Sequence, residues 1–286
     1  MRYFHIGLAK AGSTLIQRNI LPNLSSLKYV GNFSDTNKIK NYSDDYYNSL
    51  INHIRFNKSL KNESYIKNLD NFFLSEEGIS NGSNQQIINS ALRIKKIYPK
   101  NNKFLIIIRE QKSLLISKYF QYIKKNKIEP NLFIKRYTEN NNNSMTINFD
   151  EIFNLYSDIF GKNNITIIPY ELLLKNKSYF IDEISKFCSH KISKNYSFED
   201  KKINDKQRLM HTYNPYSKYT KFLNSNVKKF LLNKISPKLI YTMMTYNREN
   251  IFDKTSIALI TRQSKESNSK ILKYCNFDLK KFNYDV

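Results

Sequence analysis

The stretch that decides the fold of this chain lies near its start and reads Phe4-His5-Ile6-Gly7-Leu8-Ala9-Lys10-Ala11-Gly12-Ser13-Thr14. Residues 2–6, just before the first glycine, are rich in aromatic and β-branched side chains, which predicts a buried strand. Residues 15–21 carry apolar side chains at helical spacing and are followed by Pro22, which predicts a helix. A strand, a glycine-bounded loop and a helix in this order offer backbone N–H groups and the positive end of a helix to a phosphate.

The loop departs from an ordinary P-loop in the position of its lysine. The P-loop pattern G-x-x-x-x-G-K-[ST] has lysine after the second glycine, whereas here that place is taken by serine and the lysine lies inside the loop. The pattern is G-x-x-K-x-G-S-T, and it resembles the 5′-phosphosulfate-binding loop of sulfotransferases that use PAPS (3′-phosphoadenosine 5′-phosphosulfate). The resemblance implies that the donor binds to Lys10, Ala11, Gly12, Ser13 and Thr14. A glycine turn that only joins a strand to a helix is the alternative interpretation.

The composition predicts a globular protein with an anionic partner. A chain of 286 residues is long enough to bury a sizeable core. The net charge of +23 is spread along the chain and suits a nucleotide, an acidic glycan, nucleic acid or a membrane surface. No nucleic-acid-binding signature accompanies it, so we do not expect nucleic acid as a partner.

The spacing of the cysteines and histidines predicts no metal site. The chain has two cysteines and four histidines, and neither set shows a ligand spacing. We expect both thiols to be reduced and buried. No signal-peptide pattern and no membrane-spanning apolar run occurs, so we expect a cytoplasmic protein, with peripheral attachment to a membrane as an alternative.

Predicted strands alternate with predicted helices along the chain. Apolar runs indicate further strands at residues 27–30, 71–78, 104–108 and 165–171, and helical spacing indicates helices over 46–60, 87–97, 112–126, 152–159 and 179–188. This alternation predicts an α/β protein with a central parallel sheet flanked by helices, a three-layer P-loop-like fold. We expect a single domain over residues 1–286, with an α/β core at 1–190 and a mostly helical C-terminal extension at 191–286.

A second signature follows the strongest predicted strand. Arg109 comes directly after residues 104–108, and Ser117 lies eight residues further on, in a predicted helix. This arrangement resembles the element of PAPS-dependent sulfotransferases that binds the donor's 3′-phosphate, although the intervening proline common in that family is absent. Arginine presents a planar fork to phosphate oxygens, and the serine adds a hydroxyl near a helix start. The resemblance therefore implies that Arg109 and Ser117 bind the 3′-phosphate.

The predicted strand at residues 71–78 ends in Ser75-Glu76-Glu77-Gly78, which resembles a strand end of bacterial sulfotransferases. Ligands of parallel sheets gather at the carboxyl ends of strands. We expect Glu77, or as second choice Glu76, to be the base that takes the acceptor's proton, since neighbouring strand residues point to opposite sides. A surface carboxylate or a helix-start acid is the alternative for either.

Lys10 is the candidate for stabilising the charge that develops on the leaving phosphate, because it is the one charged residue of the loop. Simple electrostatic binding of the donor is its alternative role. Lys206 and Arg208 lie in a late basic stretch that in many family members covers the 3′-phosphate, and a solvated basic loop is the alternative here. His5 and Glu171 are expected to be structural.

The sequence thus predicts sulfuryl transfer from PAPS to an acceptor hydroxyl, with PAP (adenosine 3′,5′-bisphosphate) as product and no metal. The closing residues 277–284 resemble the tail of carbohydrate-type bacterial sulfotransferases, which makes a carbohydrate the expected acceptor and a small molecule the alternative. Two other functions compete: a P-loop kinase, which would need Mg²⁺, and a non-enzymatic protein that binds polyanions through its lysines.

Overall fold

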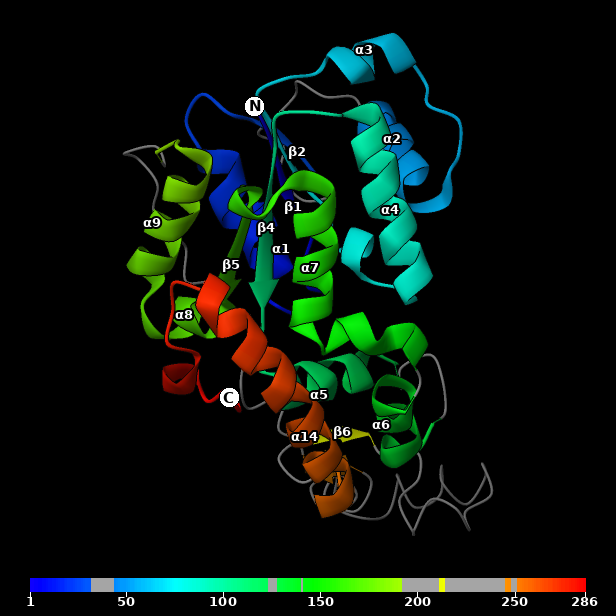
Figure 1. Ribbon diagram of the computed structural model, residues 1–286, viewed down its shortest axis with the longest axis vertical. Helices are drawn as coiled ribbons and strands as arrows, with labels where there is room; N and C mark the ends of the chain where they lie inside the picture. Colours follow the sequence, from blue (N-terminus) through cyan, green and yellow to red (C-terminus); the bar gives the residue numbers. More distant parts are fainter. Residues whose placement is uncertain (32–43, 123–127, 140, 192–210, 214–244, 248–250) are drawn as a thin grey trace, which may run out of the picture.

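The computed structural model describes residues 1–31, 44–122, 128–139, 141–191, 211–213, 245–247 and 251–286. Its centre is a five-stranded parallel sheet in the order β2-β3-β1-β4-β5 (Figure 1). The strands are β1 (Arg2–His5), β2 (Lys28–Val30), β3 (Phe72–Ser75), β4 (Asn102–Ile108) and β5 (Ile165–Pro169). The helices are α1 (Ser13–Leu15), α2 (Asp44–Phe56), α3 (Glu63–Asn68), α4 (Asn84–Ile97), α5 (Gln111–Tyr122), α6 (Pro130–Thr138), α7 (Phe149–Phe160), α8 (Tyr170–Lys175), α9 (Lys177–Cys188) and α14 (Lys254–Ile271).

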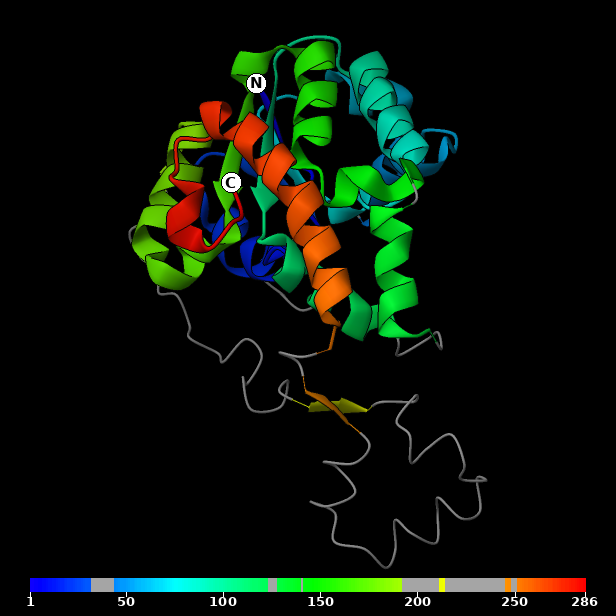
Figure 2. The ribbon, with the colours of Figure 1, turned by 60° about the horizontal axis from the view of Figure 1, so that its bottom comes forward.

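Alternate residues of β1 contact opposite helical layers. The Tyr3 ring packs edge-on against Phe187 of α9, with centroids 5.6 Å apart. Its neighbour Phe4 stacks on Phe104 of β4 at 5.1 Å, and Phe104 in turn meets Tyr156 of α7 at 5.0 Å. Helix α9 therefore covers one face of the sheet, while α7, with α4 beside it, covers the other (Figures 1 and 2). The predicted three-layer α/β fold is confirmed.

Each of the five predicted strands is present at its apolar run, and the polar residues that follow the strands shorten two of them. The run at 71–78 forms a strand only as far as Ser75, because Glu77–Ser80 turns into the short 3₁₀-helix η3. The helix predicted after the first loop begins as α1 and continues as η1 (Ile16–Ile20) and η2 (Leu21–Asn23). Pro22 lies in that last turn, where it prevents the helix from continuing.

The C-terminal part returns to the main core. Ile271, Cys275, Leu279 and Tyr284 belong to the same buried cluster as Tyr3, and α14 runs diagonally across the molecule (Figure 2). Both cysteines are free and buried, as predicted. The sequence did not predict the antiparallel pair β6 (His211–Tyr213) and β7 (Thr245–Asn247). The division of a single domain at residue 190 stays a prediction, since much of 192–250 lies outside the described residues.

In the part of the chain that the structure describes, no helix is both long enough and apolar enough to pass through a membrane.

Candidate active site

The loop between β1 and α1 has a backbone that requires its two glycines. Gly7 has φ +117° and Gly12 has φ +82°, a region that side-chain-bearing residues rarely adopt. A Cβ atom at Gly12 would lie 2.6 Å from the Tyr170 ring, so backbone and ring are in direct contact. Lys10 also has a positive φ, of 72°, a strain that persists only where the surrounding structure fixes it. No side chain caps α1 at Gly12, which leaves the first amides of this helix available to an anion.

The polar side chains of the loop fall into two groups: one is buried and stabilises the loop, and the other is accessible from outside. Ser13 is buried, and its hydroxyl donates to the Leu8 carbonyl at 3.4 Å, which holds the loop together. Thr14 is exposed and Lys10 is half-buried. Of the loop residues predicted to bind the donor, Lys10 and Thr14 therefore carry the side chains that an incoming ligand can reach.

Arg109 brings the two predicted phosphate signatures together, although they are 99 residues apart. Its Nη1 donates to the Lys10 carbonyl at 2.8 Å, and its guanidinium lies 5.1 Å from the centroid of the Tyr170 ring. The Arg109 Nε is buried and has no hydrogen-bond partner among the described residues. Tyr170 thus contacts both Gly12 and Arg109. Burial raises the pKa of Tyr170, and the Arg109 charge opposes that shift.

Ser117 lies half-buried on α5, the helix that begins just after Arg109. Its position at the same end of the sheet as Arg109 follows from the direction of β4, whose carboxyl end leads into α5 (Figure 1). The basic pair predicted to close over the donor, Lys206 and Arg208, lies outside the described residues.

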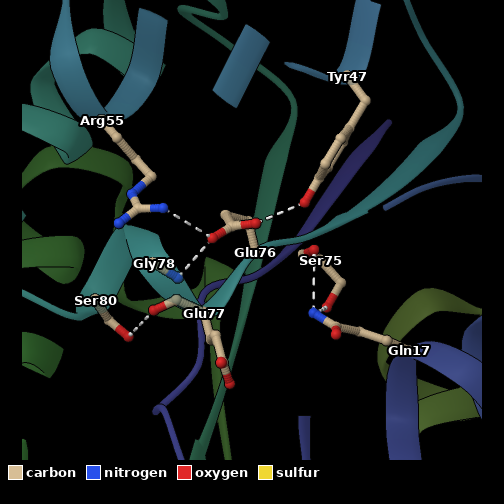
Figure 3. A network of polar contacts seen from close by, with 8 residues as sticks. All are labelled: Gln17, Tyr47, Arg55, Ser75, Glu76, Glu77, Gly78 and Ser80. Carbon is tan, nitrogen blue, oxygen red and sulfur yellow. Dashed lines mark hydrogen bonds and ion pairs between the residues drawn. The ribbon is translucent and has the colours of Figure 1, made fainter. Parts of the chain in front are cut away.

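Glu76 is engaged by groups of the protein itself. Its carboxylate accepts hydrogen bonds from the Tyr47 hydroxyl at 2.6 Å and the Gly78 amide at 2.9 Å, and it pairs with Arg55 at 3.5 Å (Figure 3). Burial, followed by the charge of Glu76, raises the pKa of Tyr47 well above its ordinary value. The carboxylate therefore fastens α2, which supplies Tyr47 and Arg55, to the end of β3.

Glu77 points away from that cluster, as neighbouring residues at a strand end do (Figure 3). Only its main-chain carbonyl is used, as acceptor for the Ser80 hydroxyl at 3.4 Å, and its carboxylate has no hydrogen-bond partner among the described residues. A Cβ atom at Gly7 would lie 3.5 Å from the Cα atom of Glu77. The loop between β1 and α1 and Glu77 are therefore in van der Waals proximity, which glycine at position 7 permits.

Lys118 is a further candidate residue at this site, and the sequence analysis did not single it out. It follows Ser117 on α5, and its Nζ donates to the Asn81 side chain at 3.2 Å, just beyond η3. Burial and the charge of Lys10 lower the pKa of Lys118 to about 8, while the charge of Glu77 acts in the opposite direction. Lys118 is thus close enough to both Lys10 and Glu77 for their charges to act on it. No motif signals this residue, because its neighbours come from distant parts of the chain.

Comparison with known proteins identifies the family. A model of the sulfotransferase domain matches residues 2–256. The chain belongs to the sulfotransferase family. It is a PAPS-dependent enzyme, and the family releases PAP as product.

Two solved sulfotransferases are similar in structure to this one. The sulfotransferase from Alicyclobacillus acidocaldarius aligns with a TM-score of 0.49 and 10% identity, over 92% of this chain and 94% of that one. Mouse sulfotransferase SULT7A1, solved in complex with PAP, aligns with a TM-score of 0.47 and 11% identity, over 99% of this chain and 87% of that one. The comparison with curated proteins found no match.

A buried hydrogen-bond network in the sulfotransferase stabilises the loops that follow β1 and β3. His5, fully buried at the end of β1, has its Nδ1 2.7 Å from the Ser75 hydroxyl oxygen, and Gln17 of η1 donates to the same oxygen at 3.1 Å. The network joins β1, the helical turn η1 that follows the loop after β1, and β3, which leads to the two glutamates. Burial lowers the pKa of His5 to about 4. The prediction that His5 is a hydrogen-bonded core residue is confirmed.

Glu171 has the structural role that was predicted for it. Its carboxylate accepts hydrogen bonds from the Glu110 amide at 3.0 Å and from the Tyr284 hydroxyl at 2.7 Å. Burial raises the pKa of this carboxyl group. Glu171 thereby ties the C-terminal segment of the sulfotransferase to the residue that follows Arg109. Among its described residues, no three His, Cys, Asp or Glu side chains are grouped as metal ligands.

Proposed function

We propose that PAPS binds with its 5′-phosphosulfate on the loop from Gly7 to Thr14 and its 3′-phosphate on Arg109 and Ser117. The observation that carries this proposal is the hydrogen bond from Arg109 to the Lys10 carbonyl, which sets the two phosphate signatures side by side. The product PAP carries roughly three to four negative charges. The cations of Lys10 and Arg109 and the uncapped start of α1 supply a matching positive environment.

The proposed transfer step uses Lys10 and Glu77. An acceptor hydroxyl oxygen attacks sulfur, so that a new O–S bond forms while the S–O bond to the 5′-phosphate breaks and PAP leaves. Lys10 stabilises the charge that develops on the bridging oxygen. The Glu77 carboxylate takes the proton of the attacking hydroxyl, a role for which its lack of a hydrogen-bond partner among the described residues leaves it available. Glu76 is the weaker candidate because three groups of the protein already hold it.

The acceptor that we propose is a carbohydrate hydroxyl. The sequence of residues 277–284, which resembles the tail of carbohydrate-type sulfotransferases, supports this proposal. The net charge of +23 also suits a glycan with acidic groups.

The donor site is tested by calorimetric titration with PAP and, separately, with ATP and Mg²⁺. We expect PAP to bind without added metal, and Arg109→Ala to weaken this binding at least tenfold, because a charge-assisted hydrogen bond to phosphate contributes about 1.5–3 kcal/mol. The matched control is Arg262→Ala, which removes the same side chain from the exposed surface of α14. Equal PAP affinity of the wild type and Arg109→Ala would show that the donor site is misplaced. Binding of ATP–Mg²⁺ with indifference to PAP would contradict the proposed function itself.

A further inference from the structure

The amine of Lys118 lies near the short helix η3, which begins at Glu77. It reaches from α5 to the Asn81 side chain, 3.2 Å away, which closes the short helix that Glu77 begins. On its other side it lies 5.7 Å from the centroid of the Tyr137 ring on α6. Lys118 therefore spans three elements, η3, α5 and α6, around the place where an acceptor must approach Glu77.

The electrostatic surroundings of this amine favour an added negative charge. Within the described residues no carboxylate lies in ion-pair distance of Lys118; the hydrogen bond from its Nζ goes to the neutral side-chain amide of Asn81. Burial is the main cause that lowers the pKa of Lys118; the charge of Glu77 favours its cation and exceeds the opposing effect of Lys10. A cation that has lost part of its hydration and has no carboxylate at ion-pair distance is stabilised by an anion that enters the site.

The surface beside Lys118 combines aromatic rings with a second cation. Tyr122 lies four residues after Lys118 on α5, so both occupy the same side of that helix. Arg136 of α6 donates to the Tyr122 hydroxyl at 2.7 Å. Tyr122 and Tyr137 are both half-buried, which leaves part of each side chain at the surface. Tyrosine offers an apolar face together with a polar tip, a combination that suits a sugar ring bearing a charged substituent.

We propose that Lys118, with Tyr137 beside it, binds a negatively charged group of the acceptor, a carboxylate or a sulfate close to the hydroxyl that becomes sulfated. This inference rests on the proposed role of Glu77 as the base. We assign the donor's phosphates to the loop and Arg109, and we assign Lys118, which contacts Asn81 and the Tyr137 ring of α6, to the acceptor. The enzyme would accordingly prefer acidic glycans to neutral ones.

The test measures binding of matched glycans to the PAP-loaded protein by calorimetry. One pair is a uronate-bearing oligosaccharide and the same compound with its carboxylates reduced to alcohols. The other pair is a sulfated oligosaccharide and its desulfated form. We expect the charged member of at least one pair to bind tenfold or more tightly than its neutral partner, and the pair that shows this preference identifies the anion.

Two variants connect the preference to Lys118. Lys118→Met keeps the length of the side chain and removes its charge, and we expect it to bring the charged-to-neutral ratio close to one without changing PAP affinity. Lys135→Met is the control, since Lys135 is an exposed lysine on α6 that pairs with Glu139, and it should keep the wild-type ratio.

Every other outcome contradicts the proposal in an identifiable way. Equal binding of the charged and neutral forms by the wild type, including binding of neither, overturns the inference, as does a preference that survives Lys118→Met. Loss of PAP affinity in Lys118→Met would assign the residue to the donor instead. Failure of the wild type to bind PAP would refute the proposed function, whereas PAP binding without a charge preference refutes only the role of Lys118.

Discussion

The buried imidazole of His5 makes the stability of the fold depend on pH. Burial lowers the pKa of His5 from its ordinary value of 6.5 to about 4, so between these values the unfolded chain binds a proton that the folded protein excludes. The contribution of His5 to the free energy of unfolding is therefore complete above pH 6.5 and is lost as the pH falls to 4. A pKa difference of about 2.5 corresponds to about 3 kcal/mol, of which about 2 kcal/mol is lost by pH 5.

The substitution His5→Gln removes this titration and keeps a side chain that can hydrogen-bond to Ser75. We expect the wild type to lose about 2 kcal/mol more stability than His5→Gln between pH 7 and pH 5, measured by urea unfolding at both pH values. Other titrating groups are the same in both proteins, so their contributions to the pH dependence of the unfolding free energy cancel when the two proteins are compared. His53→Gln, in which a half-buried histidine on α2 is replaced, gives the baseline for removing any histidine. If His5→Gln lost as much stability as the wild type on acidification, the imidazole would not be buried in its neutral form.

Three further substitutions test the site. We expect Gly12→Ala to lower the free energy of unfolding by about 1–3 kcal/mol, because its φ of +82° is strained for alanine and the new methyl group would press on Tyr170; a melting temperature equal to the wild type would refute the described loop geometry. Glu77→Gln should lower kcat by about 10²–10⁴-fold with PAP affinity and melting temperature unchanged, as expected for loss of a general base. Glu76→Gln should show the opposite profile, a loss of about 1–3 kcal/mol in unfolding free energy because Arg55 is left without its charge partner; turnover lost at unchanged stability would exchange the roles of the two glutamates.

The strands and the glycine-bounded loop after β1 could be predicted because their signals are local. An apolar run buried on both faces, such as residues 104–108, forms a parallel strand wherever helices cover it, and Gly7 and Gly12 bound a turn whatever lies beyond it. The spacing of Arg109 and Ser117 likewise depends on one strand end and one helix. The meeting of these signatures through Arg109 and the Lys10 carbonyl then follows from the adjacency of β1 and β4.

The contacts that distinguish the two glutamates are visible only in the tertiary structure. Both follow the same strand; the sequence put Glu77 first and Glu76 second and indicated that they point apart, but it could not show what each contacts. Which one faces the loop depends on α2, because Tyr47 and Arg55 from that helix hold Glu76. The role of Tyr170 could not be predicted from the sequence either. The sequence assigned its segment to a strand end, and its contacts with Gly12 and Arg109 depend on tertiary packing.

By itself the sequence determined the layered α/β fold, the glycine-bounded loop after the first strand and the family resemblance, since hydrophobic periodicity, glycine conformation and short-range spacing are properties of neighbouring residues. Only the tertiary structure decided that Glu77 is the available carboxylate and that Lys118 stands beside it. Those assignments depend on contacts between η3, α2, α5 and α6, elements far apart in the chain. Burial and through-space charge act over distances in the folded molecule, and the sequence order does not record those distances.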